Sequence, residues 1–291
     1  MNSKKLVISG GKGGVGKSML CSALAMLFSR TKKIVAVDCD VDAPNLAIWL
    51  NETKNWEKIK KISVSEKPII DNSKCNGKCA DCVKKCRFGA LKLIKGKLKL
   101  NSFLCEGCGA CEIFCPSGVI KMKPVKNGEI RIKKTKYNFS LVSGQLFPGE
   151  TGSGKVVAEI KKEAEKFKHN IMLIDSAPGT GCPVIASLQD ANFVILVTEP
   201  TLSGLADLKR VLQVVNHFGV PWSFVINKWD INPFLSKKIE KTFKNKLLGR
   251  ISYDKKIFES ISNLIPIMET DLMAKIEIKN IYNKLKNNFK F

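Results

Sequence analysis

The stretch Gly10–Ser18, GGKGGVGKS, lies between a short apolar run and a helical one. Leu6–Ser9 before it predicts a strand, and Lys17–Arg30 after it has leucines at helical spacing. Gly11 to Ser18 satisfies G-x4-G-K-[ST], the pattern of a phosphate-binding loop. Such a loop requires a strand before it and a helix after it, and both are predicted here. The stretch therefore predicts a βαβ nucleotide-binding unit at the start of the chain.

Each residue type in this loop suits phosphate binding. The glycines let backbone N–H groups approach phosphate oxygens, Lys17 reaches the β- and γ-phosphates, and Ser18 ligates Mg²⁺. The following helix adds its positive end. The residues that we expect around the phosphates are Gly11, Lys12, Gly13, Gly14, Val15, Gly16, Lys17 and Ser18.

Beyond the loop, apolar runs alternate with helical segments. Further strands are predicted at Ile34–Val37, Ile171–Ile174, Phe193–Val197 and Trp222–Ile226. Helices are predicted at Leu205–Phe218, Pro233–Phe243 and Leu272–Phe289. Continuous apolar strands that alternate with helices are typical of a parallel sheet covered on both faces. The predicted fold class is therefore α/β, with a parallel-sheet P-loop domain.

Eight of the eleven cysteines form two quartets within the chain. They are Cys75, Cys79, Cys82 and Cys86, then Cys105, Cys108, Cys111 and Cys115. The second quartet reads C-x2-C-x2-C-x3-C-P, the run by which bacterial ferredoxins hold two [4Fe-4S] clusters. Zinc is the alternative, because C-x2-C pairs also bind it. Two runs of ferredoxin type favour two clusters.

In such ferredoxins the fourth cysteine of each run ligates the other cluster. This rule predicts one cluster on Cys75, Cys79, Cys82 and Cys115, and another on Cys86, Cys105, Cys108 and Cys111. The first run departs from the pattern. Three residues, Asn76 to Lys78, separate its first two cysteines, and Arg87 stands where proline is common. The geometry of the first cluster is therefore less well defined by the sequence.

The cysteine-rich segment interrupts the alternation of strands and helices. Residues 72–119 contain no long periodic segment, and residues 120–142 alternate like a hairpin or a sheet edge. We therefore predict a P-loop domain in two parts, 1–71 and 120–291. Residues 72–119 would form an inserted two-cluster ferredoxin domain.

The composition excludes some classes of protein. Hydrophobic residues make up 44%, which is enough for a core, and no apolar run is long enough to cross a membrane. Cysteines at metal spacing, without a secretory N-terminus, indicate a reducing cytoplasm. The net charge is +23, but only five of the 49 basic residues are Arg and the lysines are spread along the chain. This pattern favours compositional bias over an acidic partner, a nucleic acid or an anionic membrane surface.

The additional Lys12 gives K-G-G-x-G-K-[ST], which resembles the deviant Walker A motif of the MinD/ParA ATPases and the nitrogenase iron protein. Asp38–Asn45 and Asp175–Gly181 each follow a predicted strand, where that family has its two switch segments. Asn227-Lys228 follows another strand, where the family reads adenine. With its insertion, the chain resembles the MinD-superfamily ATPases that carry an inserted ferredoxin domain.

The resemblance implies a chain that binds and hydrolyses ATP as an ATP-dependent homodimer. Lys12 would reach the partner's phosphates, and Lys12, Lys17 and Asp40 would form the catalytic group. Asp40 would orient the attacking water, because phosphoryl transfer depends on positioning and charge stabilisation. Asp38 and Asp175 would serve Mg²⁺ together with Ser18. A turn or capping role is the alternative for Asp38.

The preferred function is ATP-dependent redox work, in which a dimer switch gates electron transfer from the clusters to a partner protein. One alternative is a cluster carrier or assembly ATPase with an apo-protein as its partner. Another is a positioning ATPase of MinD type whose clusters are structural. A buried eight-cysteine module favours the first function over the carrier.

Several other features have ordinary interpretations. Gly149–Lys155 also fits G-x4-G-K, but Val156 follows where Ser or Thr is required, so we interpret it as a loop before the helix Val156–Phe167. Cys182 lies seven residues after Asp175, the offset of a cluster-ligating cysteine in the nitrogenase iron protein, yet a second such cysteine is missing, so loop packing is preferred.

The remaining cysteines and the last helix are predicted to serve the core. Cys21 and Cys39 lie in a predicted helix and at the end of a predicted strand. Ile281, Leu285 and Phe289 share one face of the last helix. That face predicts a helix that covers the core rather than a membrane anchor.

Overall fold

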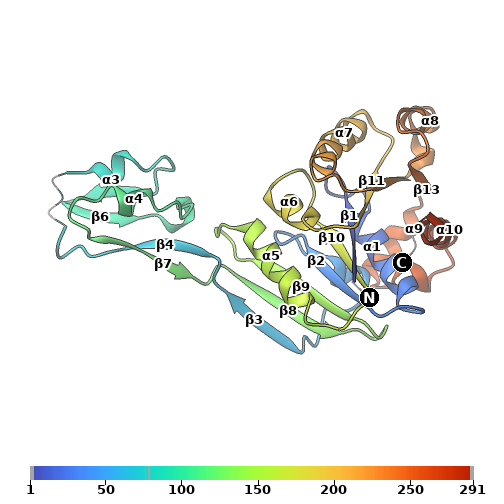
Figure 1. Ribbon diagram of the computed structural model, residues 1–291, viewed down its shortest axis with the longest axis horizontal. Helices are drawn as coiled ribbons and strands as arrows, with labels where there is room; N and C mark the ends of the chain where they lie inside the picture. The colour runs from blue at the N-terminus through green and yellow to red at the C-terminus, as the bar shows by residue number, and fades with distance from the viewer. Residues whose placement is uncertain (1–2, 76, 78, 289–291) are drawn as a thin grey trace.

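The computed structural model describes residues 3–75, 77 and 79–288. It has a large α/β body and a small lobe, and a two-stranded ribbon joins them (Figure 1). Asn76, Lys78 and Phe289, which were named above, lie outside the described residues.

A nine-stranded sheet forms the centre of the body in the described part of the chain. In spatial order its strands are β13 (Leu247–Ile251), β12 (Trp222–Asn227), β11 (Phe193–Thr198), β1 (Lys4–Ser9), β10 (Ile171–Ser176), β2 (Ile34–Cys39), β9 (Ser140–Leu146), β8 (Gly128–Lys134) and β3 (Lys58–Ile62). The strands from β13 to β9 run parallel, which confirms the predicted parallel sheet. The last two strands, β8 and β3, are antiparallel additions at one edge.

Helices cover both faces of this sheet. One face packs against α1 (Lys17–Phe28), α2 (Leu46–Trp49) and α10 (Met273–Asn288). The other packs against α5 (Ser153–Ala164), α6 (Cys182–Leu188), α7 (Leu202–His217) and α8 (Pro233–Thr242). Alternate residues of β1 serve the two cores, since Leu6 and Ile8 join the first and Val7 joins the second. Full burial of one such side chain stabilises the fold by about 1.5–3 kcal/mol.

The C-terminal helix α10 covers the core, as its apolar face predicts. Ile281 and Leu285 are buried against the body, and the Tyr282 ring meets Phe28 of α1 edge to face. No helix in the described residues is long and apolar enough to cross a membrane. Cys21 and Cys39 are also fully buried.

The small lobe extends from the ribbon made by β4 (Ser65–Ile70) and β7 (Ile120–Val125). Residues 72–119, predicted as an inserted domain, lie between these two strands. They form the short helices α3 (Asp81–Lys84) and α4 (Ala110–Ile113), and the hairpin of β5 (Leu91–Ile94) and β6 (Lys97–Leu100). The hairpin turns at Lys95-Gly96, where both residues have positive φ, the backbone of a type I′ turn. Cysteines, leucines and Ile120 form the core of the lobe.

Candidate nucleotide site and cysteine cavities

The phosphate-binding loop lines a pocket of about 470 Å³ at the carboxyl ends of the parallel strands. Gly13, Gly14, Gly16, Lys17 and Ser18 form one wall. Asp40 and Asp42 from the segment after β2, and Asn227 and Lys228 from the end of β12, also line it. Residues from three separate segments of sequence therefore meet at one site.

The loop is held by a contact that excludes larger side chains. Asn227 donates its amide hydrogen to the Val15 carbonyl oxygen at 2.9 Å. Gly16 has a φ of +98°, and a Cβ added there would lie 2.5 Å from the Asn227 amide nitrogen. The side chain predicted to read adenine thus also fixes the phosphate loop.

Asp175 at the end of β10 suits a bound cation. It is fully buried, and among the described residues neither of its carboxylate oxygens has a hydrogen-bond partner. Burial raises its pKa, while the nearby Ser18 hydroxyl and Lys17 oppose the rise. A buried, unpaired carboxylate next to Ser18 is a suitable donor set for Mg²⁺, which prefers oxygen ligands.

Asp38 and Asp40 occupy different environments after β2. Asp38 is fully buried and accepts backbone N–H bonds from Asp40 at 3.2 Å and Leu46 at 2.9 Å. Those bonds favour the turn role, which the sequence left as the alternative to Mg²⁺ support for Asp38. Any effect of Asp38 on Mg²⁺ would then act through the conformation of this loop. Asp40 is half-buried in the pocket wall, and burial raises its pKa against the opposing charge of Lys17.

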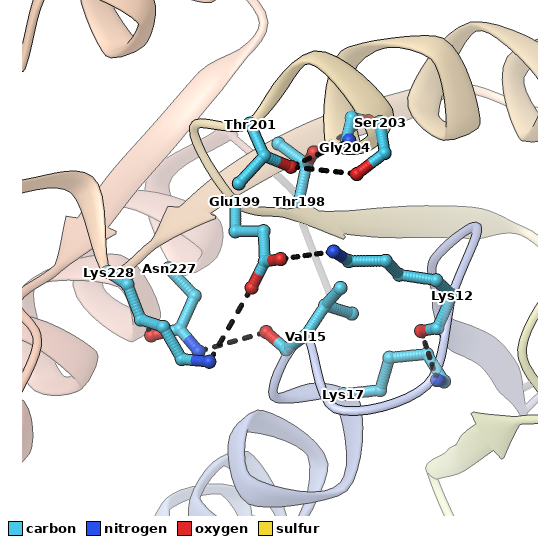
Figure 2. Close-up of polar contacts among 10 residues, drawn as sticks. All are labelled: Lys12, Val15, Lys17, Thr198, Glu199, Thr201, Ser203, Gly204, Asn227 and Lys228. Carbon is cyan, nitrogen blue, oxygen red and sulfur yellow. Dashed lines mark hydrogen bonds and ion pairs between the residues drawn. The ribbon is translucent and has the colours of Figure 1, made fainter. Parts of the chain in front are cut away.

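The two lysines of the loop point in different directions (Figure 2). Lys17 is buried, and it donates to the Lys12 carbonyl oxygen at 3.3 Å. Its burial lowers its pKa, and the charges of Asp175 and Asp40 oppose that shift. Lys12 instead forms an ion pair with Glu199, which follows β11 and also faces Lys228 at 3.5 Å. The lysine predicted to reach a partner's phosphates is therefore held within its own chain by a buried carboxylate.

Glu199→Gln is expected to strengthen ATP-dependent dimerisation several-fold. The substitution removes the ion pair that holds Lys12, so less free energy is needed to free Lys12 for the partner's phosphates. Sedimentation with a non-hydrolysable ATP analogue measures the effect. Glu240→Gln is the matched control, since it removes a carboxylate from a surface pair with Arg250. Unchanged or weaker dimerisation of Glu199→Gln would contradict the cis restraint on Lys12.

The pocket has an apolar wall that sequence reasoning missed. Ile257, Phe258 and Ile261 from α9 (Lys255–Ser262), and Trp49 from α2, line it. Phe258 is 67% exposed, so its ring is available to a ligand. The only signal in the sequence is the spacing of apolar residues in α9, which a core-facing helix would share.

The predicted second cysteine set surrounds one cavity in the lobe. Cys86, Cys105, Cys108 and Cys111 all line it, although Cys86 belongs to the first run. Burial and the neighbouring Cys105 and Cys108 raise the pKa of the Cys111 thiol to about 11. Four thiols around one cavity are a donor set that suits an iron–sulfur cluster.

The predicted first set also gathers across the two runs. Burial and the neighbouring thiols of Cys115, Cys79 and Cys75 raise the pKa of the Cys82 thiol. Within the described residues, no group of three or more His, Cys, Asp or Glu could hold a single metal ion. Each thiolate around a [4Fe-4S] cluster binds a different iron. The absence of a site for a single ion therefore does not test for a cluster.

The cysteines are less buried than expected from the sequence. Cys82, Cys105 and Cys115 are buried, but Cys79 and Cys108 are exposed. The expectation of a wholly buried eight-cysteine module was therefore wrong. The cause is the size of the lobe, whose small core cannot cover both cysteine sets.

The lobe and the body share a cleft of about 590 Å³. Glu106, between two cysteines of the second set, lines it from the lobe. Asp42 and Cys182, which follow β2 and β10, line it from the body, as does Lys155. Lys67 of the ribbon forms an ion pair of 2.7 Å with Glu150 in the same wall. The cleft thus places the first predicted switch segment, and the residue directly after the second, beside a cysteine loop.

The second glycine-rich motif belongs to this junction. Helix α5 begins at Ser153, so the last glycine of this motif, Gly154, already lies within the helix, whereas α1 begins at Lys17, after the last glycine of the phosphate loop. A Cβ at Gly149 would collide with the Phe103 ring of the lobe at 2.2 Å. The loop before α5 therefore contacts the lobe. This placement agrees with its interpretation as a connecting loop before a helix.

Residues 6–267 match the CobQ/CobB/MinD/ParA nucleotide binding domain. The chain belongs to this family. The match spans both parts of the body and the lobe between them. The predicted MinD/ParA-type resemblance is confirmed for the nucleotide-binding fold.

Two comparisons extend along nearly the whole chain. An uncharacterized protein of Methanocaldococcus jannaschii is 36% identical over 282 residues, covering 97% of this chain and 96% of that protein. The structure of the septum site-determining protein MinD from Pyrococcus horikoshii, complexed with Mg-ADP, aligns with a TM-score of 0.63 at 18% identity. That alignment covers 99% of this chain and 97% of the other. At this identity the likeness shows the fold alone.

Two further relatives of this chain, both from M. jannaschii, have names that concern iron and sulfur. An iron-sulfur cluster carrier protein is 24% identical over 97% of this chain and 83% of its own length. An uncharacterized ferredoxin is 37% identical over 57 residues, which cover 19% of this chain and 92% of the ferredoxin. The ferredoxin match is partial, so the inserted two-cluster domain remains a proposal.

Proposed function

We propose that this chain is an ATPase whose nucleotide state controls a two-[4Fe-4S] module that exchanges electrons with a partner protein. ATP and Mg²⁺ occupy the pocket of the phosphate loop, and ATP binding closes a homodimer through Lys12. Hydrolysis, with Asp40 orienting water, reopens it. Cys75, Cys79, Cys82 and Cys115 hold one cluster, and Cys86, Cys105, Cys108 and Cys111 hold the other.

The observation that carries this proposal is the cleft between lobe and body. Asp42 and Cys182 follow the two strands whose ends face the nucleotide, and Glu106 lies between Cys105 and Cys108 of the second set. A change in the first switch segment, or one that the second passes on to the adjoining Cys182, therefore alters the wall that faces that cysteine loop. The Lys67–Glu150 ion pair and the approach of Gly149 to Phe103 link the lobe to that wall, and through them a small shift would become a rigid-body movement of the lobe. The second cluster is the one we expect to respond to nucleotide.

A carrier function is the second candidate, because Cys79 and Cys108 are exposed and one relative is named an iron-sulfur cluster carrier protein. Clusters held as cargo would leave the chain, whereas redox centres would stay. Each set nevertheless includes a buried thiol, Cys82 and Cys115 in the first and Cys105 in the second, and the second set lines one cavity, which favours retention.

Incubation of the cluster-loaded protein with an apo-[4Fe-4S] acceptor distinguishes the two candidates. We expect the iron to stay with this chain, with and without Mg-ATP, while ATP changes the rate at which a soluble one-electron acceptor reoxidises the reduced clusters. Separation of the proteins followed by iron analysis measures transfer, and stopped-flow absorbance measures reoxidation. Lys17→Ala is the control for nucleotide binding. Stoichiometric, ATP-dependent transfer of iron would establish the carrier function instead.

A further inference from the structure

A basic, unpaired surface covers the lobe beside its second cysteine set. Between Cys82 and Cys105 the chain has seven basic residues and no acidic one. All seven are exposed: Lys84, Lys85, Arg87, Lys92, Lys95, Lys97 and Lys99. Several lysines elsewhere form ion pairs, but no ion pair found in the described residues involves this segment. The basic character of this segment is thus not neutralised within the chain.

The hairpin of β5 and β6 concentrates this charge on one face. Its outer face consists of Lys92, Ile94, Lys97 and Lys99, all exposed, which we call the hairpin surface. Lys92 stands directly opposite Lys99 across the two strands. Like charges at such positions destabilise a strand pair, and an acidic partner would relieve the repulsion. The hairpin therefore presents a field that suits a negatively charged surface.

The inner face of the same hairpin covers the cysteines. Leu91 and Leu100 line the cavity of the second set, and Leu98 lies in the lobe core. Phe88 also lines that cavity and is 45% exposed. A single layer of side chains therefore separates the hairpin surface from the proposed second cluster.

We propose that the hairpin surface is the docking site for a small acidic electron-transfer protein, an inference that rests on the proposed redox function. One electron would leave the reduced cluster of one protein and enter the oxidised cluster of the other, with no bond made or broken. Opposite charge would steer the encounter and orient it. The exposed Ile94 supplies apolar contact among the lysines, which suits a protein surface more than a phosphate backbone.

The test uses a reduced acidic two-[4Fe-4S] ferredoxin as the donor and the cluster-loaded chain as the acceptor. Stopped-flow absorbance gives the second-order rate of electron transfer at low and high ionic strength. Lys92→Glu combined with Lys99→Glu is expected to lower the rate roughly tenfold at low salt, and the difference should shrink at high salt, where charges are screened. Lys237→Glu with Lys241→Glu on α8 makes the same change in net charge far from the lobe and should leave the rate within about twofold.

A single variant separates docking from folding. Lys92→Glu places opposite charges across the strands, so the hairpin should keep or gain stability while the rate still falls. Anaerobic calorimetry with the oxidised ferredoxin measures the loss of binding without any electron transfer. Equal rates and affinities for the hairpin variants and the α8 control, with cluster content intact, would overturn the docking proposal.

The remaining outcomes also decide between partners. Binding of a 20-base-pair DNA duplex or of phosphatidylglycerol vesicles that the hairpin variants abolish, without change in the ferredoxin rate, would overturn a protein partner. If ATP leaves the rate unchanged in all variants while the charge dependence remains, docking is supported and nucleotide control, the core of the proposed function, is refuted.

Discussion

Cys86→Ala is expected to remove the second cluster, although Cys86 belongs to the first cysteine run. Cys86 lines one cavity with Cys105, Cys108 and Cys111, so its loss leaves that cluster with three thiolates. Anaerobic protein should contain about eight iron and eight sulfide per chain, and the variant about four of each. Iron and sulfide analysis with electron paramagnetic resonance of the reduced protein measures both the number and the identity of the remaining clusters.

The controls follow from the same pairing. Cys108→Ala should leave the same spectrum as Cys86→Ala, whereas Cys79→Ala and Cys115→Ala should share the other one. If Cys86→Ala gave the same remaining spectrum as Cys79→Ala, that result would contradict the interleaved arrangement. Stoichiometric zinc without sulfide in native anaerobic protein would remove the iron–sulfur proposal.

Lys17→Ala and Lys12→Ala are expected to separate nucleotide binding from dimerisation. Lys17 is buried in the phosphate pocket, and a hydrogen bond to a charged group contributes about 1.5–3 kcal/mol, so its loss should weaken ATP binding roughly 10- to 100-fold. Lys12 faces Glu199 instead, so Lys12→Ala should keep much of the binding and lose ATP-induced dimerisation. Calorimetry measures the first effect and sedimentation the second.

Two results would count against this assignment. A Lys12→Ala variant that still dimerises with ATP would show that Lys12 does not act across the interface. The same oligomer in nucleotide-free, ADP and ATP states of the unsubstituted protein would exclude the dimer switch altogether.

The body of the fold could be predicted because each of its signals is local. The loop around Gly16 satisfies G-x4-G-K-[ST] between a strand and a helix. Along the rest of the chain, apolar runs alternate with segments of helical spacing. Strand β3 was harder than the hairpin edge predicted within residues 120–142, because its pairing with β8 joins residues far apart in sequence. Lys58–Ile62 in particular has three lysines among its five residues and no continuous apolar run.

The site divides in the same way. Cysteine spacing predicted which thiols would gather, because the ferredoxin pattern already contains the crossing between runs. The apolar wall from Phe258 and the ion pair of Lys12 with Glu199 could not be predicted, since each joins elements placed together only by the sheet. The cleft that Glu106 shares with Cys182 depends on how the ribbon directs the lobe, which no local pattern specifies.

The central claim is that the nucleotide pocket and the clusters are coupled, and linkage makes this directly measurable. If ATP alters the clusters, their reduction must alter ATP affinity by the same factor. Anaerobic titration of ATP into dithionite-reduced and oxidised protein is the test. We predict affinities that differ several-fold, together with a matching shift in the potential of the second cluster. Identical affinities in the two redox states, with unchanged potentials, would contradict the account.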